Sequence, residues 1–466
     1  MKKYDIVFVG LGAAGLFAAY ELTKLKTRQR VLIIEKGREL KKRRCPIDND
    51  KVKKCINCKS CSIMSGAGGA GAFSDGKYNI TTAFGGDIKN YLGYEKSMEL
   101  MRYVDGVNMD MGGSGCKKYS TAGSDIKAEA LKYDLHLLDA EVRHLGTDKN
   151  YVILSNIIEY VGSSVDILYE TEVTDIVRAG ESCWQTVTEE EVYESSKVVI
   201  AAGRSGSAWA SKICAGLGVS QRDNRVDIGV RFECPALIWD HITDKVYESK
   251  IIYRSPVTGC TCRTFCMNRH GYVVTENTNG IMTANGHSFD DPALASDNTN
   301  FALLVTHHFT EPFDDSNAYG QAIAKLTNAL AGGVMVQRFG DLVANKRSTR
   351  KRISESFTRP TLEAAEPGNL ALAIPKLTLD TIIEMIYQLD KLVPGTANFD
   401  NLLYGAEVKF YNSMADVDGN FETAHKGLFI IGDCSGTTHS LSQASAEGVY
   451  VARYLEKLFL EGTGIR

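Results

Sequence analysis

The chain has 466 residues and a formal net charge of −4, and 24% of its residues are charged. Because no basic block dominates any part of the chain, we expect neither nucleic acid nor an acidic membrane surface as its partner. No window reaches the roughly 18 uncharged apolar residues that a membrane span needs, so we expect a cytoplasmic protein of two or three domains.

The first predicted elements are a strand, a tight turn and a helix. The apolar run 4–9 leads into Gly10-Leu11-Gly12-Ala13-Ala14-Gly15, which opens a helical pattern. In such a motif the glycines permit the turn, the approach of a pyrophosphate and close packing of the helix, and the helix N-terminus attracts phosphate. The motif predicts dinucleotide binding by Gly10, Gly12, Ala13, Ala14 and Gly15.

A second apolar strand, 31–34, ends at Glu35. An acid at this distance from the glycine turn can accept hydrogen bonds from an adenosine ribose, so Glu35 and the adjacent Lys36 are predicted to contact the cofactor. The basic run 41–44 follows. It is either a solvated loop or a group of cations near the cofactor phosphates.

Four cysteines cluster after the basic run: Cys45, Cys55, Cys58 and Cys61. Their spacing resembles iron-sulfur ligation, although ferredoxin-type sequences place the Cys-Pro pair downstream, and four thiolates can also bind structural zinc. Reduced thiols, or a redox pair without metal, are the alternative. A cytoplasmic location disfavours structural disulfides.

A glycine-rich stretch, 65–77, follows the cysteines and implies backbone that lies close to a flat or charged group. Helices are predicted over 87–107, 124–138 and 147–160, the last two with serine and threonine caps. Strands are predicted over 165–169 and 172–177, and the buried strand 197–201 ends the first cofactor-binding segment. The candidate cofactor contacts in these segments are Gly68, Gly69, Val173, Ala202 and Gly203.

The sequence pattern changes between 206 and 403. Residues 226–233 alternate with period two, as strands do, and 319–331 and 379–392 have helical patterns. This mixture predicts an inserted α+β substrate domain over 206–403, while 1–205 and 404–466 form one discontinuous cofactor-binding domain.

Near the C-terminus, the apolar strand 427–431 ends in Gly-Asp, and a helix of small residues begins near 442. In many FAD-binding oxidoreductases such an Asp binds the ribityl chain and the following helix directs its amides at the flavin. Coupled to the N-terminal motif, this pattern favours FAD, with the protein supplying position and electrostatics. The candidate contacts here are Gly432, Asp433, Ala444 and Gly448.

Further motifs resemble a known family. They are the runs 68–77, 144–148, 263–268, 285–288, 300–303 and 407–411. With them the chain is similar, over nearly its whole length, to poorly characterised bacterial FAD-dependent dehydrogenases. The resemblance implies an α/β fold with a Rossmann-like FAD-binding domain of the glutathione-reductase type. It implies no particular substrate, and functions of the additional N-terminal domain that many members carry are not transferred.

Several side chains are candidates for chemistry. His439 lies before the final helix, and the reference pKa of a histidine side chain suits proton transfer near neutrality. His144 lies in a polar loop that could reach a substrate. Lys77 and Arg263 could stabilise a reduced flavin or bind a carboxylate. For each histidine the alternative is a structural hydrogen bond, and for each cation it is surface pairing.

The sequence therefore predicts an FAD-dependent oxidoreductase that transfers a hydride between flavin and a small organic substrate, with an activated C=C bond as one candidate. A flavin monooxygenase and a non-catalytic redox-sensing flavoprotein are the alternatives. No second glycine motif lies between a strand and a helix, so NAD(P)H as donor stays open. An electron-donor protein and the oligomeric state stay open as well.

Overall fold

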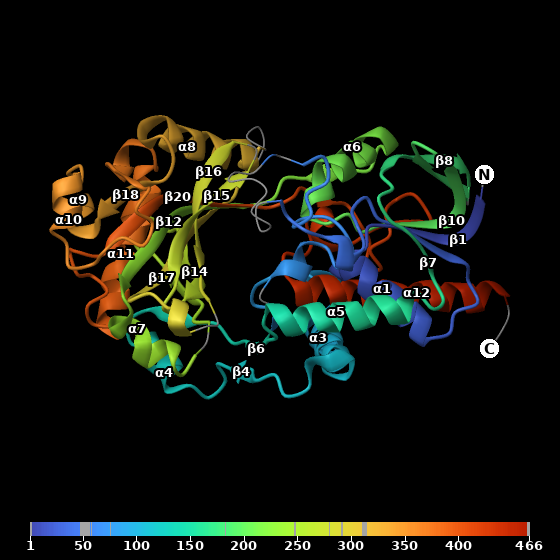
Figure 1. Ribbon diagram of the computed structural model, residues 1–466, viewed down its shortest axis with the longest axis horizontal. Helices are drawn as coiled ribbons and strands as arrows, with labels where there is room; N and C mark the ends of the chain where they lie inside the picture. The colour runs from blue at the N-terminus through green and yellow to red at the C-terminus, as the bar shows by residue number, and fades with distance from the viewer. Residues whose placement is uncertain are drawn as a thin grey trace. The chain divides into compact units, whose positions relative to one another are not determined.

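The computed structural model describes residues 2–46, 56, 58–74, 76–181, 183–246, 248–278, 280–289, 292–309 and 315–463. The chain divides into two compact units (Figure 1). Unit 1 contains Met1–Lys118, Glu141–Arg222 and Asn412–Arg466, and unit 2 contains Tyr119–Ala140 and Asp223–Tyr411. None of the helices in the described ranges combines the length and apolar character that crossing a membrane requires.

Unit 1 is built on a largely parallel sheet with the strand order β7-β2-β1-β10-β9-β8, and β22 pairs with β10. The strands are β1 (Lys2–Val9), β2 (Val31–Ile34), β7 (Asp166–Leu168), β8 (Val173–Gly180), β9 (Cys183–Thr188), β10 (Val192–Ile200) and β22 (Leu428–Ile430). Pairing is parallel among β7, β2, β1, β10 and β22, and antiparallel for β8 and β9. This confirms the predicted mixed α/β architecture.

Helices cover both faces of this sheet, which is why its central strands are apolar on both sides. Along β1, Ile6 and Phe8 join a core with α1 (Ala13–Lys24), α3 (Tyr94–Asn108), α5 (Thr147–Val161) and α12 (Leu441–Thr463). Val7 and Val9 point to the opposite face and join a core with α6 (Ser207–Leu217). Unit 1 also contains β3 (Lys77–Ile80), α2 (Lys89–Leu92), β6 (Glu141–His144), β11 (Gln221–Arg222) and β21 (Met414–Ala415), and β4 (Lys118–Ser120) joins β3 and β6 in a small sheet.

Unit 2 contains an eight-stranded sheet with the order β19-β18-β20-β12-β17-β14-β13-β5. Its strands are β5 (Leu135–Leu137), β12 (Val226–Pro235), β13 (Ile251–Arg254), β14 (Thr261–Asn268), β17 (Asn298–His307), β18 (Met335–Arg338), β19 (Glu366–Pro367) and β20 (Leu402–Phe410). A separate hairpin consists of β15 (Tyr272–Thr278) and β16 (Ile281–His287). The helices are α4 (Asp125–Leu131), α7 (Ala236–Thr243), α8 (Ser316–Ala331), α9 (Phe339–Val343), α10 (Arg350–Ser354) and α11 (Lys376–Leu392).

The period-two pattern of β12 separates two faces of the unit 2 sheet. Ile228, Val230 and Phe232 pack in an apolar core that also contains residues of α11. The alternate residues Asp227 and Arg231 are charged, yet both are fully buried. One face of this sheet is therefore apolar, and the other carries buried polar groups.

The boundaries of the two units differ from the predicted domain boundaries at 205/206 and 403/404. Residues 207–217 form α6, whose buried Ala210 and Ile213 pack in a core of unit 1, and β20 extends to Phe410 as an inner strand of the unit 2 sheet. The segment Tyr119–Ala140 belongs to unit 2, because β5 pairs with β13 far along the chain. Such boundaries depend on pairing between distant segments.

Three predicted helices differ in detail. The helix predicted over 124–138 ends at Leu131, although Ser124 caps it as expected. The helix predicted over 87–107 is interrupted at Gly93. This glycine has a φ of 76°, which is not helical, so α2 ends before it and α3 begins after it. Helix α5 includes Thr147 as its first residue, and Gly146 takes the capping position.

Candidate cofactor-binding site

Strands β1, β2, β10 and β22 of the unit 1 sheet end at the same edge. In the strand register Val9 pairs with Ile34 and with Ile200, and Ile200 pairs with Ile430. The residues that follow these strands include the predicted contacts Gly10, Glu35, Ala202, Gly203, Gly432 and Asp433. Carboxyl ends of parallel strands are the usual ligand-binding edge of such a sheet, so the fold brings these distant segments together where a ligand is expected.

The glycines of the first turn serve different purposes. A Cβ at Gly10 would lie 2.5 Å from the carbonyl oxygen of Ala201, and one at Gly15 would lie 2.2 Å from that of Gly10. Both distances are too short for any side chain. Packing of strand and helix therefore explains Gly10 and Gly15 without a ligand.

Gly12 has no such packing reason. Its φ of −81° is open to any residue, and the nearest atom to an added Cβ is Gly69 Cα at 3.8 Å. Gly12 precedes α1, which has no acidic residue in its first turn and no side-chain cap. The free amides of a helix N-terminus attract anions, so this space suits a phosphate group.

Glu35 connects three backbone segments through its buried carboxylate. Its Oε2 accepts from the amide of Leu11 at 2.8 Å, and its Oε1 accepts from Gly37 at 2.8 Å and Gly66 at 3.0 Å. A carboxylate offers about four acceptor positions, so these three bonds leave one position on Oε2. Glu35 therefore organises the turn itself and keeps capacity for one further donor, such as a ribose hydroxyl.

Arg43 is a positioning residue that the sequence did not single out. Among the basic residues 41–44 it alone is buried, and its guanidinium donates to the carbonyls of Ser62, Ile63, Ala67 and Gly69 at 2.6–2.9 Å. Burial lowers its pKa to about 10, so Arg43 stays charged at neutral pH. It holds the glycine-rich loop, which contacts the turn where Gly68 N donates to Leu11 O at 2.8 Å. The solvated-loop interpretation holds for Lys41, Lys42 and Arg44, which are exposed, but not for Arg43, because burial against carbonyls is not a pattern that local sequence reveals. A role of this run near the cofactor phosphates stays a prediction.

Asp433 follows the β22 strand and pairs with Arg204. Its Oδ2 accepts from Arg204 Nε at 2.8 Å, and its Oδ1 accepts from Thr438 Oγ1 at 3.3 Å. Because 58% of the Arg204 side chain is exposed, this ion pair contributes little to stability. Gly203 has no atom within 4 Å of an added Cβ. The edge beside Asp433 can therefore admit another group.

Glu447 lies in α12, and its buried side chain forms a hydrogen bond with the backbone of the Gly432–Asp433 turn. It is fully buried, and its Oε2 accepts from the Gly432 amide at 2.7 Å. From its Oε1, short contacts run in series to Thr437 Oγ1 (2.8 Å), then to Ser435 Oγ (2.5 Å), then to the Gly432 carbonyl oxygen (2.7 Å). These three contacts need three hydrogens, and the two hydroxyls supply two.

A protonated Glu447 supplies the third hydrogen. Burial, together with the nearby charge of Asp433, raises the pKa of Glu447 to about 8, which agrees with the hydrogen count. At neutral pH a neutral acid therefore donates to Thr437, which donates to Ser435, which donates to the Gly432 carbonyl. The sequence signal was a lone acid within a run of small residues at the start of a buried helix.

The catalytic candidates occupy two places in unit 1. Lys77 and His144 are cross-strand neighbours in the β3–β6 pair. The His439 amide donates to Gly85 O at 2.9 Å in the loop that follows β3, and its carbonyl accepts from Arg204. The fold thus brings Lys77 next to His144, and it places His439 beside Arg204, the residue that pairs with Asp433.

The remaining predicted cofactor contacts occupy buried or supporting positions. A Cβ at Gly448 would lie 2.1 Å from the carbonyl oxygen of Ala14, so Gly448 is required where α12 crosses α1. Ala444 is buried in the same core and Val173 begins β8. Lys36 donates to the carbonyl of Ser205 at 3.4 Å. These contacts explain each position without a direct cofactor contact, and whether they also touch a cofactor stays a prediction.

The cysteine prediction is only partly covered, because Cys55 lies outside the described residues. Cys58 and Cys61 are exposed, and Cys45 is half-buried. Within the described ranges, no group of three or more His, Cys, Asp or Glu side chains is arranged to hold a metal ion. Iron-sulfur or zinc ligation by these cysteines stays a prediction.

No family model matches the chain. An uncharacterized protein of Clostridium beijerinckii is 26% identical over 477 residues, which cover 97% of this chain and 81% of that protein. The similar solved structures include glycine oxidase from Geobacillus kaustophilus, which is 13% identical with a TM-score of 0.41 over 98% of this chain and 95% of that one. They also include FAD-bound L-α-glycerophosphate oxidase from Mycoplasma pneumoniae, 13% identical with a TM-score of 0.40 and the same coverage. L-proline dehydrogenase from P. horikoshii is 12% identical, with a TM-score of 0.38 over 99% and 94% of the chains. At these values the likenesses assign the chain to no family.

Replacement of Gly12 by alanine should separate ligand binding from folding. The added methyl group has room within the protein, so the melting temperature should stay close to wild type. The same methyl group would occupy the space of the pyrophosphate, and FAD affinity should fall about 100-fold or more. Flavin titration of the purified protein measures the loss. Gly216→Ala, which also has open space around its Cβ, is the control, and equal FAD affinity in both variants would contradict the assignment of Gly12.

Replacement of Arg43 by lysine should destabilise unit 1. A lysine ammonium has three donors and cannot reach all four carbonyls, and hydrogen bonds to charged groups contribute about 1.5–3 kcal/mol each. We expect a loss of roughly 3 kcal/mol in the free energy of unfolding, measured by denaturant titration. The adjacent exposed Arg44 provides the control, since Arg44→Lys should change stability by less than about 0.5 kcal/mol. Similar losses in both variants would show that burial of Arg43 is unimportant.

The raised pKa of Glu447 gives stability a pH dependence with a defined sign. The folded pKa of about 8 exceeds the usual 4.5, so the folded state binds an extra proton between these values. Its stabilising contribution is complete below pH 4.5 and is lost as pH rises to about 8. Glu447→Gln should therefore make the decline in unfolding free energy shallower, by up to about 1.4 kcal/mol per pH unit. Urea titrations at successive pH values measure this slope, and the exposed Glu461→Gln on the same helix should leave it unchanged.

Proposed function

We propose that unit 1 binds FAD and that the protein is an FAD-dependent oxidoreductase acting on a small organic substrate. The observation that carries the proposal is Gly12. No contact among the described residues requires glycine there, yet the space over it adjoins a helix N-terminus without acidic residues. A phosphate-bearing ligand supplies the missing reason.

The other residues at the strand ends fit the remaining parts of a dinucleotide. Glu35 keeps one acceptor position that suits the adenosine ribose. Asp433 is partly exposed and can accept from the ribityl hydroxyls that distinguish FAD. Ser442, at the start of α12, has a buried hydroxyl with no hydrogen-bond partner among the described residues. A group with polar edges would satisfy it.

The chain's own residues set the electrostatics of this site. The N-terminal amides of α1 favour the negative charge of a pyrophosphate. Protonation of Glu447 avoids a second negative charge beside Asp433, and Arg204 compensates the first. When bound, the flavin would supply hydride transfer to or from a carbon centre of the substrate. Lys77, His144 and His439 are the candidates for moving protons or stabilising charge, and the glutathione-reductase subtype rests on the sequence motifs.

The decisive experiment is an absorption spectrum of anaerobically purified protein, followed by titration of the deflavinated protein with FAD and separately with NAD⁺. We expect flavin absorbance and one tightly bound FAD per chain. Asp433→Ala should weaken FAD by roughly 1.5–3 kcal/mol, because it removes a charge-assisted hydrogen bond. Absence of flavin bands together with no FAD binding by folded protein would refute the proposal. Anaerobic reduction of the bound flavin by candidate donors then tests the oxidoreductase activity.

A further inference from the structure

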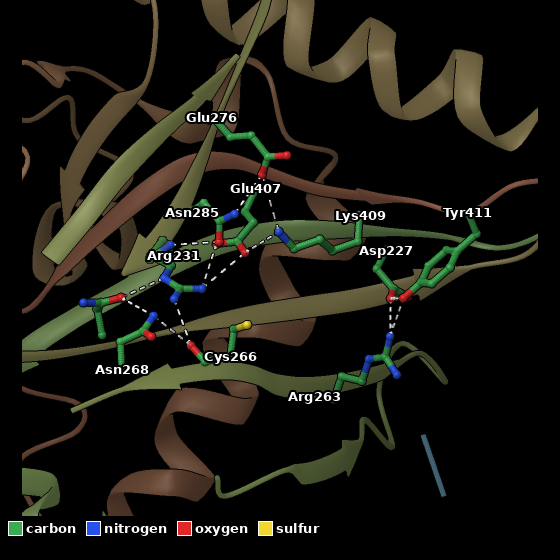
Figure 2. A network of polar contacts seen from close by, with 12 residues as sticks. Asp227, Arg231, Arg263, Cys266, Asn268, Glu276, Asn285, Glu407, Lys409 and Tyr411 are labelled. Atoms are coloured by element: carbon green, nitrogen blue, oxygen red, sulfur yellow. Dashed lines mark hydrogen bonds and ion pairs between the residues drawn. The ribbon is translucent and has the colours of Figure 1, made fainter. Parts of the chain in front are cut away.

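A second group of charged and polar side chains, buried or half-buried, lies on the polar face of the unit 2 sheet. It consists of Arg225, Asp227, Arg263, Thr306 and Tyr411, and we call it the Asp227 cluster. Asp227 lies on β12, Thr306 on β17 and Arg263 on β14, while Arg225 precedes β12 and Tyr411 follows β20. Figure 2 shows Arg263, Asp227 and Tyr411 directed toward one another.

Within this cluster the Asp227 carboxylate accepts three hydrogen bonds, which use three of its roughly four acceptor positions. Asp227 Oδ1 accepts from Thr306 at 2.7 Å, and Oδ2 accepts from both Arg263 and Tyr411. Burial would raise the pKa of Asp227, but Arg263 and the hydrogen bonds outweigh it and hold that pKa below its usual value. Burial and Asp227 raise the pKa of Tyr411 to about 12, so its phenol stays neutral and donates to Asp227.

The two arginines, by contrast, retain donors without acceptors. Arg263 uses Nη2 for Asp227 and Tyr411, while its Nε is buried without a partner among the described residues. Arg225 stacks on the Tyr411 ring, with its Cζ 4.9 Å from the ring centroid, and its Nε is likewise buried and unpartnered among the described residues. Buried donors of charged groups are normally satisfied.

Arg231, on the same face of the same sheet, shows what a purely structural arginine looks like. It is fully buried, and all three of its nitrogens donate: Nε to Asn300, Nη1 to Glu407 and Nη2 to the Cys266 carbonyl (Figure 2). Lys409 adds to this pairing, with its Nζ 3.4 Å from Glu407. The fold can therefore satisfy a buried guanidinium here, but among the residues that the structure describes it leaves the Nε of Arg225 and the Nε of Arg263 without an acceptor.

We propose that the Asp227 cluster binds the carboxylate of a small organic acid through Arg225 and Arg263. The two guanidinium charges and the one carboxylate leave a net charge of +1 on the cluster, which a single carboxylate neutralises and a phosphate dianion would overshoot. A planar carboxylate also matches the donor geometry of a guanidinium. The site goes beyond flavin binding, and only the identification of this acid as the substrate rests on the proposed function.

Calorimetric titration of the full-length protein tests the site, with acetate, succinate and benzoate as probes and the neutral acetamide and benzamide as matched controls. Each titration is run with FAD-loaded and FAD-free protein. We expect at least one carboxylate to bind with 1:1 stoichiometry and neither amide to bind. Arg263→Met should weaken that carboxylate about tenfold or more. The exposed Arg254→Met in β13 should leave its affinity unchanged.

Arg225→Met is the second variant, because loss of Arg263 would leave Asp227 buried without its cation and could unfold the chain. Arg225 stacks on Tyr411 and its charge helps to lower the pKa of Asp227, but the ion pair to that carboxylate comes from Arg263. Replacement of Arg225 should therefore preserve the circular dichroism spectrum while weakening the carboxylate by a similar factor. No carboxylate binding to folded wild-type protein, or binding that Arg225→Met leaves unchanged, would overturn the proposal. Tighter binding of inorganic phosphate than of any carboxylate would overturn it too. Carboxylate binding by a protein that binds no FAD would support this site and defeat only the proposed function.

Discussion

The candidate site depends on direct contact between backbone atoms at one edge of the unit 1 sheet. Gly10 lies against the carbonyl of Ala201, Gly15 against that of Gly10, and Gly448 against that of Ala14, each without room for a Cβ. Contacts this close permit almost no adjustment, because neither partner has a side chain that can move. They fix the first strand, the first helix and the last helix in register, and thereby align segments from both ends of the sequence.

Glu35, Arg43 and Glu447 are buried around this edge, and each offsets the penalty of burial differently. Three backbone amides donate to the carboxylate of Glu35. Arg43 stays charged because four carbonyls accept from it. Glu447 takes up a proton instead, since its hydroxyl partners have one hydrogen too few. All three bonds of Glu35 and all four of Arg43 go to the backbone, so these side chains hold loops that have no regular structure of their own.

Unit 2 shows the same principle on a sheet. Its polar face contains one arginine that the protein satisfies completely, Arg231, and another, Arg263, that it satisfies only in part. Both lie on strands of a single sheet and both carry the same charge. The difference between them lies in their neighbours: Glu407, Asn300 and a carbonyl surround Arg231, whereas the single carboxylate beside Arg263 is already shared with Tyr411 and Thr306. Two arginines on one sheet can therefore differ in role, because their neighbouring acceptors decide whether all of their donors are satisfied within the protein.

The sequence by itself determined the features that local patterns encode. Apolar runs specified the strands that end at Val9, Ile34 and Ile430, and the glycine spacing specified the turn and helix after the first, because strand and helix periodicity and tight turns depend on neighbouring residues. The position of Glu35 at a strand end, and hence its place at the sheet edge, followed from the same reasoning.

Only the tertiary structure decided what depends on residues distant in sequence. It distinguished Arg43 from its basic neighbours, because only folding brings the carbonyls of 62–69 around one of four similar side chains. It ended the fourth helix at Leu131, since the following residues pair with β13 more than a hundred positions later. It also divided the glycines into those that packing requires, such as Gly15 and Gly448, and Gly12, which packing leaves unexplained. The sequence pattern does not give the distance in space between residues that are far apart in the chain. The physical role of each of these residues depends on that distance.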